Sequence, residues 1–145
     1  MRINVVVTFS CFVVLLADTR VQMKDLPEPV QKTVREQTRN AKLRGLSKEV
    51  DHGKTFYEAE TTVEGRSRDI LIDASGAIVE VEEVTDLENI PAAARKTIEA
   101  LAGSGKIVKL ETITQGSVVS YEAVVEKGGK KSEVAVDADG SLKRK

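Results

Sequence analysis

The feature that most constrains this chain is an internal repeat. When the sequence is shifted against itself by 64 positions, so that residue 26 lies over residue 90, similar segments fall into one register. A unit that keeps Pro, Tyr-Glu-Ala and Asp-Ala-x-Gly at fixed spacing indicates a tandem duplication, in which each copy is one supersecondary unit. The matching segments are LPEPVQKTV (26–34) with IPAAARKTI (90–98), YEA (57–59) with YEA (121–123), and IDASG (72–76) with VDADG (136–140).

Each copy begins with a helix signal. A proline follows Leu26 and Ile90, and proline suits the first turn of a helix because no intrahelical donor is lost there. Apolar residues then recur at helical spacing, which predicts one buried face per helix. That face carries Val30, Val34 and Ala41 in the first copy and Ala94, Ile98 and Leu101 in the second.

Strand signals follow each helix. Runs of alternating apolar and polar residues, separated by turn glycines, predict antiparallel strands. The fold class is therefore α+β, with each repeat one helix packed on an antiparallel meander of about four strands. The same alternation suits either one continuous sheet or two facing sheets. The expected strands are 42–51, 54–63, 67–73 and 77–84, then 106–115, 117–127, 130–137 and 141–144.

The N-terminus has the pattern of an export signal. Arg2 precedes the uncharged run 3–16, which is shorter than the roughly 20 residues that a membrane-spanning helix needs, and Ala17 offers a small residue for cleavage. The pattern predicts a periplasmic or secreted protein with no stable membrane span after cleavage. The chain is thus divided into a signal peptide (1–22), a first repeat (23–86) and a second repeat (87–145).

Composition excludes several kinds of partner and cofactor. The chain has 22 basic and 23 acidic residues and no tryptophan, so neither a basic surface nor a stacking platform for nucleic acid is expected. The segment 103–106 (GSGK) lacks the remaining residues of a phosphate-binding loop, and no other cofactor motif is present. The sole cysteine, Cys11, lies in the predicted signal. We therefore expect no nucleic-acid partner and no cofactor.

No catalytic or metal-binding constellation emerges from the side chains. His52 is the sole histidine and precedes Gly53 in a predicted turn, where a solvated turn residue is expected. Glu58 and Glu122 occupy equivalent positions and could form an acid pair if two sheets faced each other, but a solvated strand face is the favoured interpretation. The segment 137–140 (DADG) resembles part of a calcium loop, yet the chain ends before such a loop would be complete. The sequence predicts no enzyme and no metal site.

These residues carry a family resemblance. The LP and IP helix starts, the YEAE and YEAV strands, and the hairpins IDASGAIVEVEE and VDADGSLKRK resemble the PepSY-like, beta-lactamase-inhibitor-protein-like group of exported bacterial proteins. Both repeats carry the resemblance, so it covers nearly all of the chain after the signal. It implies tandem helix-and-sheet units, an extracytoplasmic location, and a binding or inhibitory role without catalysis.

The expected function is therefore that of a non-enzymatic exported binding module, including inhibition or regulation of another extracytoplasmic protein. Its partner is expected to be a protein or peptide. The alternative is a small-ligand or cation-binding periplasmic sensor that uses acidic turns and strand carboxylates. The predicted binding residues, on the outward face of the sheet, are Phe56, Glu58, Glu60, Glu122 and Val124.

Overall fold

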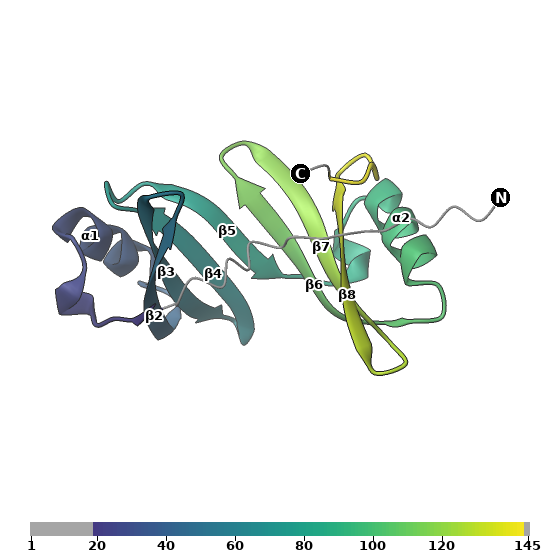
Figure 1. The fold of residues 1–145 in the computed structure, drawn as a ribbon, viewed down its shortest axis with the longest axis horizontal. Helices are drawn as coiled ribbons and strands as arrows, with labels where there is room; N and C mark the ends of the chain where they lie inside the picture. Colours follow the sequence, from purple (N-terminus) through teal and green to yellow (C-terminus); the bar gives the residue numbers. More distant parts are fainter. Residues whose placement is uncertain (1–18, 144–145) are drawn as a thin grey trace.

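A computed structural model describes residues 19–143 of the chain. Its eight strands form one antiparallel sheet in the order β1-β2-β3-β4-β5-β6-β7-β8, so each strand pairs with its neighbours in the sequence (Figure 1). Residues 1–18 of the predicted signal peptide lie outside the described residues, whereas Thr19 and Arg20 pair with β2. Within the described range, no helix is both long enough and apolar enough to cross a membrane.

Among the described residues, both halves of the chain contain a 3₁₀ turn, an α-helix and then antiparallel strands, but the first half also begins with β1 and has four strands after its helix where the second has three. The first half consists of β1 (Thr19–Arg20), a 3₁₀ turn (Met23–Asp25), α1 (Glu28–Gln37), β2 (Lys42–Asp51), β3 (Lys54–Val63), β4 (Arg66–Asp73) and β5 (Ile78–Val84). The second half consists of a 3₁₀ turn (Leu87–Asn89), α2 (Ala92–Ala102), β6 (Lys106–Gln115), β7 (Val118–Lys127) and β8 (Lys130–Asp137).

The strand predictions agree with these bounds to within one residue, except at the C-terminus. The predicted strand at 141–144 is represented by a single bridge between Leu142 and Val136, and residues 144–145 lie outside the described range. The second helix therefore lies over a meander of three strands. Of the two predicted arrangements, one continuous sheet is correct.

The two halves are joined by the pairing of β5 with β6. Four residue pairs make this ladder, from Val81 with Thr114 to Val84 with Glu111. A backbone bond from the Thr85 amide to the Leu110 carbonyl, 2.9 Å long, extends it. The ladder leaves no sheet edge between the halves, which is how a continuous sheet avoids exposing unpaired backbone groups there.

Both helices lie on the same face of this sheet. Val81 of β5 packs against the core under α1, and its cross-strand partner is Thr114 of β6. Because side chains alternate along a strand, Leu110 points to the same face as Thr114, and Leu110 belongs to the core under α2. Figure 1 shows α1 over the first half of the sheet and α2 over the second. The opposite face carries neither of these two helices.

Each helix buries a narrow apolar stripe. Val30 and Val34 of α1 are fully buried against the sheet, as are Ala94 and Ile98 of α2. The stripe continues to Ala102, so the prediction that Leu101 is buried is wrong: its exposed fraction is 44%. Successive positions four residues apart stay over the strands, whereas Leu101 is turned towards the flank of the helix. Ala41, also predicted for this face, lies beyond the C-terminus of α1 and is half-buried.

A turn of the sheet is tied to each helix by the same hydrogen bond. The Thr33 hydroxyl donates to the Gly76 carbonyl at 2.6 Å, and the Thr97 hydroxyl donates to the Gly140 carbonyl at 2.8 Å. Both glycines have positive φ, +87° and +82°, and both lie against helix backbone. A β-carbon on Gly76 would lie 2.7 Å from the carbonyl oxygen of Pro29. Glycine is thus required by the backbone conformation and by the close approach of the helix.

Gly76→Ala should destabilise the fold more than Gly65→Ala. Both glycines have left-handed backbone conformations, φ +87° and +83°, so both substitutions incur backbone strain of about 1–2 kcal/mol. Only Gly76 adds a clash with Pro29, because nothing lies within 4 Å of a β-carbon on Gly65. We expect a total loss of about 2–4 kcal/mol for Gly76→Ala in urea unfolding. Equal losses for the two variants would contradict the close helix–turn contact.

Candidate functional site

The candidate site is the open face, meaning the face of the sheet opposite α1 and α2. All five predicted binding residues lie on it. Phe56, Glu58 and Glu60 alternate along β3 with the buried Tyr57 and Ala59, which face α1. Glu122 and Val124 alternate in the same way along β7 with residues that face α2.

The structure does not bring these five residues into one cluster. Glu58 accepts a hydrogen bond from the Ser47 hydroxyl at 3.3 Å, and Glu60 forms an ion pair with Arg20 at 2.7 Å. Glu122 lies opposite Glu111 on β6. Strands β4, β5 and β6 separate Glu58 from Glu122, so the alternative in which these two carboxyls form an acid pair is wrong. The acid pair required facing sheets, and the sheet is continuous.

The open face is not uniformly solvated. Ser47, Ser120 and Glu111 on this face are exposed by only 1%, 2% and 5%. Long neighbouring side chains shield them, as where the Lys143 amino group donates to the Ser120 hydroxyl at 3.1 Å. These three buried side chains are therefore satisfied by hydrogen bonds or an ion pair with neighbouring side chains.

An acidic cluster occupies the centre of the open face, where β5 meets β6. Burial, together with the neighbouring carboxylates of Glu111 and Glu80, raises the pKa of Glu82 to about 8. Lys109 contacts Glu111 at 2.7 Å, and although burial opposes it, this hydrogen bond and the charge of Glu111 raise the pKa of Lys109. The cluster therefore holds Glu82 largely protonated at neutral pH.

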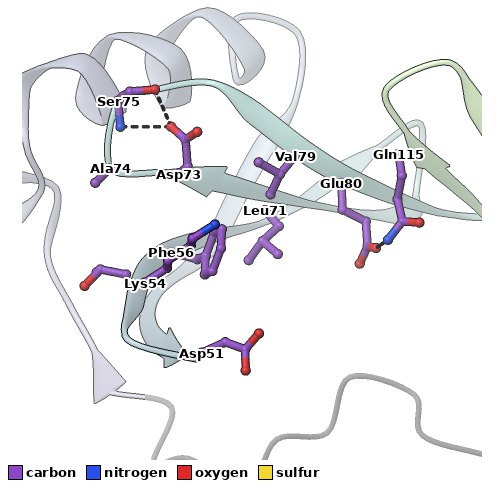
Figure 2. A pocket seen from close by; sticks show the side chains of 11 residues that line it. Asp51, Lys54, Phe56, Leu71, Asp73, Ala74, Ser75, Val79, Glu80 and Gln115 are labelled. Atoms are coloured by element: carbon purple, nitrogen blue, oxygen red, sulfur yellow. Dashed lines mark hydrogen bonds between the residues drawn. The ribbon is translucent and has the colours of Figure 1, made fainter. Parts of the chain in front are cut away.

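A groove of about 680 Å³ lies on the open face at one end of the strands. It is bordered by the β2–β3 hairpin, the β4–β5 turn and the end of β6 (Figure 2). Phe56 is the one predicted binding residue that lines it; the described lining residues also include Leu71, Val79, Glu80 and Gln115. The apolar and acidic side chains of the groove thus come from the first half of the sheet, and the second half contributes the amide side chain of Gln115.

The acidic turns hold their carboxylates internally. Asp73 accepts hydrogen bonds from the amides of Ser75 and Ala77 at 2.8 and 3.1 Å, and the Ser75 hydroxyl bond is the largest of the effects that lower the pKa of Asp73. In the second turn the capping carboxylate is Asp139, which accepts from the Ser141 amide at 2.9 Å. The two turns therefore differ in which aspartate caps them, Asp73 in the first and Asp139 in the second.

His52 lies in the β2–β3 turn, as predicted. Its φ is +46°, its side chain is 89% exposed, and its Nδ1 lies 2.6 Å from the Asp51 carboxylate. Among the residues that the structure describes, no group of three or more His, Asp or Glu side chains is arranged to hold a metal ion.

Sequence reasoning missed most of the groove. Leu71 could have been found, because it alternates with the core residues Ile70 and Ile72 and must point to the open face. Val79 could not, because it lies in a bulge where Leu71 pairs with Glu80 but Ile72 pairs with Ile78. Gln115 enters the groove only because β6 adjoins β5.

Comparison with solved structures identifies the fold. A candidate periplasmic protein of Bacteroides eggerthii superposes with a TM-score of 0.68 at 17% sequence identity, covering 82% of this chain and 86% of that one. A BLIP-like protein of Bacteroides fragilis superposes with a TM-score of 0.62 at 17% sequence identity, covering 82% of this chain and 84% of that one. A DUF2874 family protein of Bacteroides uniformis superposes with a TM-score of 0.66 at 15% sequence identity, covering 81% of this chain and 86% of that one. This chain has their fold.

The sequence itself is far from these proteins. No family model matches the chain, and no curated protein matches it. At such low identity the likeness concerns the fold, and function has to be argued from the site. The likeness agrees with the BLIP-like part of the resemblance drawn from the repeated motifs.

Glu82→Gln should remove a pH dependence of stability. The pKa of Glu82 is raised in the folded state from 4.5 to about 8, so the folded state binds this proton more tightly than the unfolded chain does. The stabilisation is complete below about pH 4.5 and is lost as the pH rises through 8. We expect Glu82→Gln to be more stable than the wild type at pH 8, by about 2–4 kcal/mol in urea unfolding.

The matched control is Glu88→Gln, which removes a carboxylate from the exposed 3₁₀ turn before α2. It should leave the decline in stability between pH 5 and pH 8 as steep as in the wild type. A Glu82→Gln profile parallel to that of the wild type would contradict the buried acidic cluster.

Proposed function

We propose that this protein is an exported, non-enzymatic binding module whose open face contacts another protein or a peptide. The proposal rests on the difference between the two faces of the sheet. Both helices and both apolar cores occupy one face, whereas the other presents a groove beside an acidic surface. A broad sheet face stabilised from behind is a rigid surface that can bind a partner without reorganising.

The periplasm is the proposed location. The predicted signal peptide (1–22) supports export, and the superposable Bacteroides eggerthii protein is itself a candidate periplasmic protein. A BLIP-like protein among the structural neighbours agrees with a binding role, including inhibition or regulation of an extracytoplasmic target.

The two halves are further proposed to be PepSY-like repeats that arose by tandem duplication, at 23–86 and 87–145. Support comes from interactions that recur at the sequence offset of 64. Thr33 and Gly76 correspond to Thr97 and Gly140, and each pair makes the same helix–turn hydrogen bond. The turn backbones also agree, with the Asp73 and Asp137 amides bonding to the carbonyls of Ala77 and Ser141 at 2.9 Å.

The alternative is a small-ligand or cation-binding periplasmic sensor, and its cation-binding form has less support in the geometry. The carboxylates of Asp73 and Asp139 accept hydrogen bonds from their own turns, and those bonds would compete with a cation. Calcium should therefore leave the melting temperature nearly unchanged, since only a ligand bound to the folded state raises it.

Photo-crosslinking from the open face tests the binding function. A benzophenone would be attached at Val124→Cys in the full chain, with Cys11→Ser to remove the other thiol. Added to extracytoplasmic extract, this variant should form a discrete adduct that excess unlabelled protein abolishes. The matched control is Glu99→Cys, on the exposed side of α2, which should form none. Equal adducts from both positions, or recovery of the expressed chain in the cytoplasm, would contradict the proposal.

A further inference from the structure

The groove on the open face has a built apolar floor. Phe56 and Leu71 lie on adjacent strands β3 and β4, and Val79 is turned towards them by the bulge in β5. Figure 2 shows these three side chains between the β2–β3 hairpin and the β4–β5 turn. All three are only partly buried, so an apolar group placed here would remove further surface from water.

The rim of the groove is acidic. Asp51, Asp73 and Glu80 line it, and Lys54 is the single cationic side chain among the described lining residues. Each carboxylate is oriented by a bond within the protein: Asp51 by His52, Asp73 by Ser75, and Glu80 by the Gln115 side chain. Ser75 and Gln115 are neutral, so these bonds fix the positions of Asp73 and Glu80 without cancelling their charges.

The size of the groove limits what can occupy it. At about 680 Å³ it lies within the range of roughly 300–1,000 Å³ that is usual for ligand sites. The groove is bordered by strand ends and hairpins and is open to solvent, so a chain can enter and leave along the sheet. A short extended segment of polypeptide fits this shape.

We infer that the groove binds a segment of a partner protein in which an apolar side chain is flanked by lysine or arginine. The apolar side chain would pack on Phe56, Leu71 and Val79. The flanking cations would approach the rim carboxylates, where opposite charge favours encounter and register. This inference rests on the proposed binding function and names the partner chemistry for one part of the open face.

Peptide titration monitored by NMR tests the inference. The ¹⁵N-labelled protein would be titrated at low salt with acetyl-Lys-Leu-Lys-amide and, in parallel, with acetyl-Glu-Leu-Glu-amide. The lysine peptide should shift the amide signals of Phe56, Leu71 and Val79 with a dissociation constant of about 1 mM, weak but measurable for so small a ligand. The glutamate peptide should bind at least about tenfold more weakly. Added salt should weaken the binding of the lysine peptide, because it screens the interaction between charges.

Charge reversal supplies the matched variants. Glu80→Lys should weaken the binding of the lysine peptide at least about fivefold. Glu88→Lys makes the same change in net charge outside the groove and should leave that binding unchanged. Leu71→Ala should weaken the binding of both peptides, because it removes part of the apolar floor of the groove. The dispersion of the amide signals in each variant shows whether the fold is intact.

Three results would overturn the inference: equal binding of both peptides, lysine-peptide shifts centred on β7 and β8, or equal weakening by Glu80→Lys and Glu88→Lys. The proposed function is judged separately by the Val124 adduct. If that adduct forms but the lysine peptide does not bind in the groove, the groove inference fails while the open face remains a binding surface.

Discussion

The pairing of β5 with β6 is the interaction on which the rest of the structure depends. Four residue pairs and the Thr85–Leu110 backbone bond join two helix-and-strand units into one sheet of eight strands. Because cross-strand partners share a face, this ladder also fixes the two helices on the same side. Without it, each unit would present a separate edge and a separate face.

The shared open face is a consequence of the β5–β6 pairing, and this pairing also brings carboxylates close to one another. Joining the units brings Glu82 of β5 beside Glu111 of β6, where burial and like charge disfavour ionisation of Glu82. The same junction places Gln115 against Glu80 and completes the groove. The junction that holds the sheet together therefore also shapes its acidic surface, to which the proposed partner would present cationic groups.

Much of the fold could be predicted from the sequence, because turn glycines and alternation act locally. The bounds of β2, β3, β6 and β8 follow from these signals, as does the outward direction of Phe56 and Glu122. The choice between one sheet and two facing sheets could not be predicted, since alternation is identical in both. The bulge at Val79 depends on how β4 pairs with β5, which the pattern of a single strand does not encode.

Hydrogen exchange across the junction tests the continuous sheet most directly. The Thr85 amide, bonded to the Leu110 carbonyl at 2.9 Å, should exchange as slowly as amides in the centre of β3 and β7, because opening the junction would disrupt the sheet as a whole. Amides in the β6–β7 hairpin turn should exchange fast in the same sample. If Thr85 exchanged at the rate of the hairpin turn while the centres of β3 and β7 remained protected, the two halves would be independent units and the shared open face would not exist.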